Sequence, residues 1–350
     1  SNATIADNTS VVTITDDETT PSLSISGSSA PDDNGTLTAT VNLSGASALT
    51  VEVYYATSNV TATAGNDYIA TSSTLTFAPG QTSKPISLTI LGDVVDEEDE
   101  IFSVTLSNPD NATLGTATAS MLITDNDPAP TISVADISTA DETATSTNVV
   151  ATLSAASEKV ITIDYTTSDG TADAGSDYTA ANGTITFAPG VTTQNIPVAI
   201  LADAIDEANE TVTITLSNPS GNPPAVVIND GTAVLTISDD DAAPAISIDD
   251  VTTASEVGIG QQVTVRLNAA SQQTVTVDYA TSDVTAWAGD DYTADTGTVT
   301  FNSGSTTETI SIPILQDSID EINETFEIQL SNPSNATIAD NTSVVTITDD

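Results

Sequence analysis

The sequence contains neither histidine nor cysteine, and its 350 residues include only three cationic side chains, Lys84, Lys159 and Arg266. Without histidine, a Ser-His-Asp or Cys-His catalytic centre and an imidazole metal site are excluded. Without cysteine, disulfides, zinc-thiolate sites and iron-sulfur clusters are excluded as well. The shortage of cations argues against nucleic-acid binding, which depends on Lys and Arg, and against binding to an anionic membrane surface.

Long hydrophobic runs are also missing. No apolar segment approaches the roughly 18 residues of a transmembrane helix, and no signal peptide opens the sequence, so we expect no direct membrane insertion. Apolar residues nevertheless make up 38% of the chain, which favours a folded protein over a disordered one. We therefore expect a soluble internal segment of a longer protein.

Acidic residues dominate the charged side chains. The 50 Asp and Glu residues against 3 Lys and Arg residues give a formal net charge of -47, although only 15% of all residues are charged. Because an average globular protein is about 25% charged, the unusual feature is the lack of counter-ions rather than the number of charges. Ion pairs within the chain cannot neutralise these carboxylates.

Internal repeats divide the chain into units of about 110 residues. The strings STLTFAPG, GTITFAPG and GTVTFNSG recur at 73–80, 183–190 and 297–304, and each is preceded by a Gly-x-Asp-Tyr string and followed by a Leu-Ser-Asn-Pro string. This order of motifs within one chain indicates three copies of one module. We predict module 1 at 18–127, module 2 at 128–241 and module 3 at 242–350.

Residues 1–17 are identical in sequence to residues 334–350. We interpret residues 1–17 as the orphan C-terminal strand of a preceding module. Such a strand would either dock on a neighbouring molecule through its exposed edge or fray, as chain termini commonly do.

Each module has the pattern of an all-β fold. Apolar and polar residues alternate with a period of two, as in 184–187 and 212–216, and no segment shows a sustained helical period. About seven short strands in about 110 residues are typical of an immunoglobulin-like sandwich. We predict tandem immunoglobulin-like antiparallel β-sandwiches, and short proline-containing linkers such as 128–130 favour an elongated array.

Carboxylates gather at four places in each module, and each place follows or precedes a predicted strand. In a Greek-key sandwich the loops cluster at the two ends, so loops that share an end would bring about eight carboxylates together. Only bound cations could make such a cluster stable, and sets of about 6–8 flexible oxygens suit Ca²⁺ better than octahedral Mg²⁺. The sequence therefore predicts Ca²⁺ sites at module ends.

The residues of this pattern recur in all three modules. In module 2 they are Glu142, Asp177, Asp203, Glu207, Glu210, Asp239, Asp240 and Asp241. In module 1 they are Asp33, Asp67, Asp93, Glu97, Glu100, Asp125, Asn126 and Asp127. In module 3 they are Glu256, Asp291, Asp317, Glu321, Glu324, Asp349 and Asp350.

The ordered combination of these motifs resembles the Calx-beta domain family, and the resemblance covers all three modules. It implies a calcium-binding β-sandwich of the kind found in sodium/calcium exchangers and in large bacterial surface proteins. By position, it implies that the module 2 residues named above are Ca²⁺ ligands, with the backbone carbonyl of Ile205 as a further ligand. Asp96, Asp206 and Asp320 lie within the same segments, and we expect them to be exposed neighbours rather than ligands.

Two differences between the modules carry further expectations. Module 1 has Asp33 where its siblings have Glu, and Asn126 where they have Asp, so we expect it to bind Ca²⁺ more weakly than module 2. Trp287 is the only tryptophan, and we expect it to pack within its loop. Because it lies four residues from Asp291, its fluorescence should report Ca²⁺.

Near-identical repetition without cysteine favours a structural role. We predict a Ca²⁺-stiffened stalk of a large extracellular or cell-surface protein, a bacterial adhesin. Its Ca²⁺ sites would be occupied at the millimolar Ca²⁺ concentration outside cells. Its partners would be neighbouring modules of the array and, through other domains, cell-surface or matrix ligands. The alternatives are a calcium sensor as in sodium/calcium exchangers and a carboxylate-based carbohydrate-active protein. Three equivalent clusters and an aromatic content of 4% argue against the latter, so we expect no enzyme.

Overall fold

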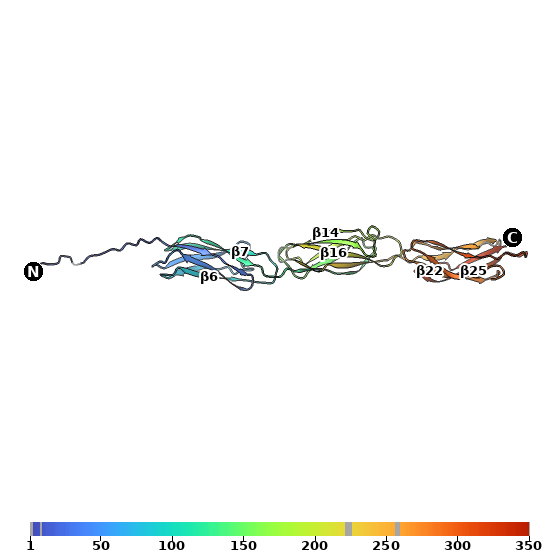
Figure 1. Cartoon of the computed structure of the whole chain (residues 1–350), viewed down its shortest axis with the longest axis horizontal. Coiled ribbons are helices and arrows are strands. Elements are labelled where there is room, and N and C mark those ends of the chain that lie inside the picture. The colour runs from blue at the N-terminus through green and yellow to red at the C-terminus, as the bar shows by residue number, and fades with distance from the viewer. Residues whose placement is uncertain (1–2, 8, 221–225, 256–259, 350) are drawn as a thin grey trace.

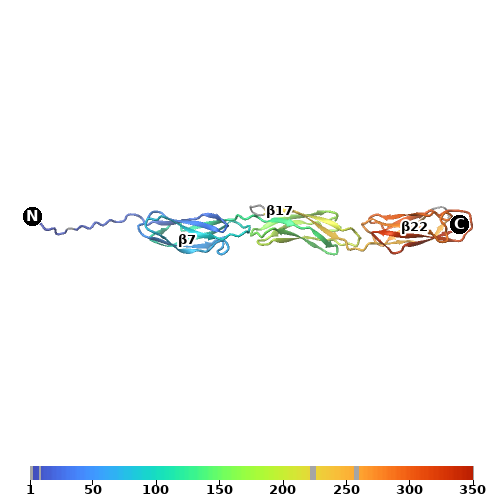
Figure 2. The same cartoon turned by 90° about the horizontal axis from the view of Figure 1, so that it is seen from below.

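The computed structural model describes residues 3–7, 9–220, 226–255 and 260–349, and it contains three β-sandwiches arranged in a row (Figure 1). A view turned by 90° shows the same narrow outline, so the array is a rod one module wide (Figure 2). The described residues contain strands and no helix, and therefore no helix long and apolar enough to cross a membrane. The predicted all-β array of tandem immunoglobulin-like sandwiches is confirmed.

Each module contains nine strands within the described residues. Module 1 contains β1 (Ser22–Ser26), β2 (Ser29–Pro31), β3 (Gly35–Leu43), β4 (Val51–Asn59), β5 (Ser72–Phe77), β6 (Ser83–Ile90), β7 (Glu100–Asp110), β8 (Thr113–Leu114) and β9 (Thr118–Thr124). Module 2 contains β10 (Thr131–Val134), β11 (Ile137–Asp141), β12 (Thr147–Leu153), β13 (Ile161–Asp169), β14 (Asn182–Phe187), β15 (Thr193–Val198), β16 (Glu210–Ser220), β17 (Val227–Asp230) and β18 (Thr232–Ser238). Module 3 contains β19 (Ala245–Ile248), β20 (Val251–Ser255), β21 (Gln261–Leu267), β22 (Val275–Asp283), β23 (Thr296–Phe301), β24 (Thr307–Ile312), β25 (Glu324–Ser334), β26 (Thr337–Ile338) and β27 (Thr342–Thr348).

A four-stranded and a five-stranded sheet form each sandwich. In module 1 their orders are β6-β3-β1-β8 and β2-β9-β7-β4-β5, and modules 2 and 3 repeat both orders. Most neighbours are antiparallel, as predicted, but β8 pairs with β1 and β2 pairs with β9 in parallel. Two such short edge strands per module bring the number above the expected seven, because they are too short to show a period in the sequence.

One apolar core fills each sandwich, and the Gly-x-Asp-Tyr motif is anchored in it. In module 1 the ring of Tyr68 stacks on Phe102 with centroids 4.0 Å apart, and Tyr292 stacks on Phe326 in module 3 at 4.1 Å. The Tyr68 hydroxyl donates a hydrogen bond of 2.6 Å to Asn59 Oδ1. The buried tyrosine thereby fixes the loop that carries the preceding aspartate.

The Leu-Ser-Asn-Pro motif marks a bulge in the long strands β7, β16 and β25. Its asparagines, Asn108, Asn218 and Asn332, have φ angles of 49°, 50° and 50°, in the left-handed region that asparagine tolerates better than most residues. The register of β7 against β4 shifts between Glu52 and Tyr54 at this point. The motif is therefore a structural signature of the module rather than part of its acidic end.

The identical segments at 1–17 and 334–350 have different structures. Val345 and Ile347 of β27 are buried between β20 and β25, with exposures of 0% and 2%. Their counterparts Val12 and Ile14 are 82% and 93% exposed, and the described part of residues 1–17 runs away from module 1 without strand pairing (Figure 1). Strand formation by this segment therefore depends on neighbouring strands. Docking of residues 1–17 on another molecule stays a prediction.

Because each module has its own core, a substitution in the core of one module should destabilise that module and leave the others unchanged. Replacing Phe102 by Ala removes a buried ring, and it should lower the free energy of unfolding of module 1 by about 3–5 kcal/mol. Hydrogen exchange read by mass spectrometry should then show faster exchange in the strands of module 1 and unchanged protection in modules 2 and 3. Tyr54→Ala, at a partly exposed ring of the same module, is the matched control. Loss of protection along the whole rod would contradict independent cores.

Candidate metal centre

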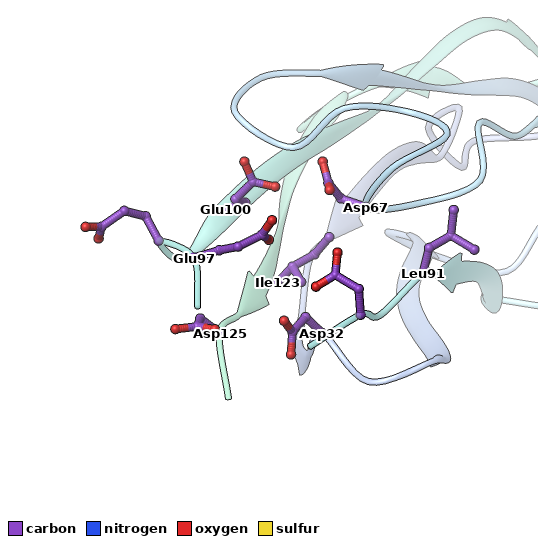
Figure 3. A pocket seen from close by; sticks show the side chains of 9 residues that line it. Asp32, Asp67, Leu91, Glu97, Glu100, Ile123 and Asp125 are labelled. Atoms are coloured by element: carbon purple, nitrogen blue, oxygen red, sulfur yellow. The ribbon is translucent and has the colours of Figure 1, made fainter. Parts of the chain in front are cut away.

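Two groups of carboxylates form at the end of module 1 that adjoins module 2. Figure 3 shows Asp32, Asp67, Glu97, Glu100 and Asp125 around one cleft at this end. We call Asp67, Glu97 and Glu100 the loop cluster, and Asp32, Asp125 and Asp127 the terminal cluster. Within each cluster, one carboxylate oxygen of every residue lies within 4.8 Å of the others. Asp32 and Asp125 line the same cleft as the loop cluster, so the two clusters adjoin.

The same clusters recur in the other modules. The loop cluster of module 2 consists of Asp177, Glu207 and Glu210, and its terminal cluster consists of Glu142, Asp203 and Asp241. The loop cluster of module 3 consists of Asp291, Glu321 and Glu324. Glu256 and Asp350, which were predicted for the end of module 3, lie outside the described residues.

Strand pairing explains why residues from distant segments meet. Antiparallel pairing of β7 with β9 sets Glu100, at the start of β7, opposite Ile123, so Asp125 follows close by. β2 runs parallel to β9, and the backbone N–H of Asp32 donates to Thr124 O at 3.0 Å. Asp67 lies in the loop between β4 and β5, and the buried side chain of Tyr68 anchors this loop.

The backbone holds the loop aspartate in a fixed orientation. The N–H of Thr63 donates to Asp67 Oδ2 at 2.5 Å. The corresponding bonds to Asp177 and Asp291 measure 2.6 Å. One oxygen of each carboxylate is thus engaged by the loop, and the other remains available to the cluster.

Fourteen of the predicted site residues fall into these clusters. They are Asp67, Glu97, Glu100, Asp125, Asp127, Glu142, Asp177, Asp203, Glu207, Glu210, Asp241, Asp291, Glu321 and Glu324. Six other predicted carboxylates are not members of these clusters: Asp33, Asp93, Asp239, Asp240, Asp317 and Asp349. The predicted ligand roles of Asn126 and of the Ile205 backbone carbonyl stay predictions.

Asp32, which was not among the predicted site residues, lies in the terminal cluster where Asp33 was expected. Asp32 is 8% exposed, and its backbone bond to Thr124 corresponds to the bond from Glu142 to Ser238 O in module 2. Asp33 is exposed and accepts a hydrogen bond from Asn126 Nδ2. The alternation of β2, in which Ala30 faces inward, was the signal that points to residue 32.

Aspartates both inside and outside the clusters shape the loops around them. Asp93 Oδ1 accepts the N–H of Val95 at 2.8 Å, and Asp203 and Asp317 each accept the N–H two residues later at 2.7 Å. Ile205 is therefore held in the loop next to Asp203. Asp239 Oδ1 accepts the N–H of Glu207 at 3.2 Å.

The middle residues of the ends of modules 1 and 2, Asn126 and Asp240, are exposed. Alternation in the extended chain explains this, because the residues on either side of Asn126 and Asp240 face inward. Asp349, which corresponds to Asp125 and Asp239, is exposed as well.

Burial is the first cause of raised pKa values in the loop clusters. It raises the pKa of Glu97 and of Glu100 to about 7, with neighbouring carboxylates adding to the effect. In module 2 it raises the pKa of Glu207 to about 7 and that of Glu210 to about 8. An ion-free loop cluster therefore keeps protons near neutral pH, and a bound cation must displace them.

Three buried carboxylate oxygens of module 1 have no hydrogen-bond partner among the described residues: Asp32 Oδ1, Glu100 Oε2 and Asp127 Oδ2. All three belong to the two clusters. A buried charged oxygen without a partner is costly, whereas a hard cation would satisfy it. The donor set is oxygen throughout, so the residues fit Ca²⁺.

The expectation that Asp96 and Asp206 are exposed is wrong. Their exposures are 2% and 7%, and each bonds to the following module. Ser157 of module 2 donates to Asp96 Oδ2 at 2.6 Å, and Ser271 of module 3 donates to Asp206 Oδ2 at 2.6 Å. Asp320, the matching residue of module 3, is exposed, as expected. Contacts between modules have no periodic signal in the sequence.

Trp287 also differs from the expectation, because it is 63% exposed rather than packed in its loop. It lines a shallow cleft together with Asp317 and the loop cluster of module 3. Its indole is therefore still next to the acidic residues, and its use as a calcium reporter stays a prediction.

Comparison with known proteins agrees with this geometry. The family model described as "Calx-beta domain" matches residues 9–127, 128–241 and 239–350. The chain belongs to the Calx-beta domain family. Its tandem Calx-beta domains are similar to rat sodium/calcium exchanger 1, with 32% identity over 188 residues, which cover 49% of this chain and 19% of the exchanger. Human sodium/calcium exchanger 3 is 32% identical over 196 residues, covering 50% of this chain and 21% of the exchanger.

Solved Calx-beta structures are also similar. The crystal structure of CBD12 from CALX1.2 covers 62% of this chain and 99% of its own, with 22% identity and a TM-score of 0.31. The apo form of the Calx CBD1 domain covers 31% of this chain and 99% of its own, with 26% identity and a TM-score of 0.29.

Calcium is the cofactor of these Calx-beta domains. The loop and terminal clusters are the residues that would hold it, and its charge would offset the repulsion among their carboxylates. The role of each residue as a ligand stays a prediction.

Without calcium, the stability of the chain should fall as the pH rises from about 5 to about 8. Glu207 and Glu210 have folded pKa values of about 7 and about 8 against an ordinary value of 4.5. Their protonated forms therefore stabilise the fold fully below pH 4.5, and this contribution is lost as the pH passes through the folded values.

Thermal unfolding in chelator at several pH values measures this effect. The double variant Glu207→Gln, Glu210→Gln should show a smaller decline of the module 2 midpoint, because its amides do not titrate. Saturating calcium should also reduce the decline in the unmodified chain. An equal decline in the variant and in the unmodified chain would contradict the assignment of the titration to these two groups.

Proposed function

We propose that the chain is a calcium-responsive array in which ions bound at the module ends help to hold one module to the next. The observation that supports this most directly is that the clusters share their loops with the joints. Asp96, which bonds to module 2, directly precedes Glu97 of the loop cluster. Asp125 of the terminal cluster forms an ion pair with Lys159 of module 2 at 3.0 Å. An ion that orders the loops of a cluster therefore also orders the contacts between the two modules.

The physical mechanism is a change in repulsion. In the ion-free chain, carboxylates within 4.8 Å of one another repel and push apart the loops that carry them. A bound divalent cation turns the same carboxylates into ligands and fixes the loops together. Because Asp96 and Asp206 lie in these loops, the serine contacts to the next module become fixed as well.

Calcium sensing has the stronger support of the two biological roles that such an array could serve. The relatives reported above are sodium/calcium exchangers, and the matched regions cover about a fifth of their length. A regulatory role would require the ion-dependent change to be passed to another domain. The structural role as an extracellular or cell-surface stalk rests on the threefold repetition of one module along one rod.

Affinity separates these two roles. Sensors bind Ca²⁺ with Kd values of about 10⁻⁷ to 10⁻⁵ M, whereas extracellular modules bind with about 10⁻⁴ to 10⁻³ M. Competition between the full chain and a calcium-binding dye gives this number. A Kd in the lower range supports the sensor, and one in the higher range supports the stalk.

Removing calcium should make the rod bend. Small-angle scattering of the full chain should give the maximum dimension of a straight rod in calcium, and a shorter and broader distribution in chelator. The variant Glu97→Gln, Glu100→Gln, Glu207→Gln, Glu210→Gln should show a smaller difference between the two conditions, since its loop clusters lose the charges that hold the ion while its terminal clusters are unchanged. An unchanged maximum dimension of the unmodified chain would contradict the proposed function.

A further inference from the structure

The two joints between modules use the same turn. At the first joint, Ser157 donates to Asp96 Oδ2, and the N–H of Glu158 donates to Asp96 O at 2.9 Å. At the second joint, Ser271 donates to Asp206 Oδ2, and the N–H of Gln272 donates to Asp206 O at 3.0 Å. Both serines are 2% exposed. The hydrogen-bonded frame of the joints is therefore equivalent.

The joints differ at the residue two positions after the serine. At the first joint this residue is Lys159, whose Nζ lies 2.8 Å from Asp96 Oδ1 and 3.0 Å from Asp125 Oδ2. Lys159 is 7% exposed, so this double ion pair is shielded from solvent. It joins the following module to both the joint aspartate and the terminal cluster of module 1.

At the second joint the corresponding residue is Gln273, which has no charge. Gln273 Nε2 donates to the backbone oxygen of Glu207 at 3.0 Å, and Gln272 Nε2 donates to Glu207 Oε1. The other two cationic side chains, Lys84 and Arg266, form no ion pair with a described residue across either joint. Arg266 pairs with Asp249 at 2.9 Å, and Lys84 lies in β6.

We propose that Lys159 makes the joint between modules 1 and 2 hold without calcium, whereas the joint between modules 2 and 3 becomes rigid only when calcium is bound. The ammonium group of Lys159 supplies positive charge at the first joint, whereas at the second joint a calcium ion from solution must supply it. The residue two positions after the joint serine thus determines the ion dependence of each joint. This inference rests on the proposed function for the second joint, but not for the first.

The charges around the first joint agree with this assignment. Glu158 adds a carboxylate that repels Glu97, but Glu158 is exposed, so solvent and salt weaken the repulsion. The pairs of Lys159 with Asp96 and Asp125 are direct and buried. Attraction therefore dominates at the first joint.

Spin-label distances across each joint test the proposal in the full chain. Because the sequence has no cysteine, labels can be confined to cysteines introduced at matched, exposed strand starts: Ser72 in β5, Asn182 in β14 and Thr296 in β23. The pair Ser72→Cys, Asn182→Cys spans the first joint. The pair Asn182→Cys, Thr296→Cys spans the second joint.

In chelator, we expect a narrow distance distribution across the first joint and a broad one across the second, which narrows on addition of calcium. Lys159→Gln should broaden the first distribution in chelator, and Gln273→Lys should narrow the second. Glu158→Gln, at the adjacent position, and Lys84→Gln, which removes a charge away from both joints, should leave the first distribution narrow. Equal widths at the two joints in chelator, or no effect of Lys159→Gln, would overturn the proposal.

The two parts of the experiment separate this inference from the proposed function. The comparison of Lys159→Gln with the unmodified chain in chelator contains no calcium, so it judges Lys159 alone. If the second joint stays broad at saturating calcium while Lys159→Gln still loosens the first, the proposed function fails and the role of Lys159 stands. Circular dichroism of each variant verifies that its modules are folded.

Discussion

Repulsion among carboxylates is the constraint on which the ends of the modules depend. Two unit charges 4 Å apart repel by about 4 kcal/mol at the effective dielectric near a protein surface, and each cluster holds three carboxylates within 4.8 Å. The fold brings them together regardless, because ladder pairing and a buried tyrosine fix their loops. Protons, calcium and, at one joint, Lys159 are three ways to relieve the same repulsion. Ion binding and the stiffness of the rod are therefore two results of one electrostatic arrangement.

Patterns that repeat along the chain made most of the fold, and the gathering of carboxylates at the module ends, predictable. The alternation of apolar and polar residues predicted the strands, and the threefold recurrence of the motifs predicted the modules. The loop clusters followed from two motifs, because the buried tyrosine of Gly-x-Asp-Tyr and the start of the next long strand place their acids at one end. The choice between the adjacent residues Asp32 and Asp33 was wrong, because a shift of one residue along a strand exchanges its inward and outward faces.

Contacts between modules were not predictable from the same patterns. Asp96 and Asp206 have the composition of exposed loop residues, and they are buried only because another module packs against them. The described parts of the segments 1–17 and 334–350 show the same limit, since the same residues form a buried strand in one place and an unpaired extension in the other. Local sequence sets the preference, and the neighbouring element decides the outcome.

Calorimetric titration of the full chain with calcium tests the central claim most directly. We expect saturable binding of more than one ion per chain, and the share of the heat that comes from the loop cluster of module 2 should be lost when Glu207 and Glu210 are replaced by Gln. Proton release should accompany binding and should show as a dependence of the heat on the ionisation enthalpy of the buffer. Absence of saturable binding at millimolar calcium would contradict calcium binding by these clusters.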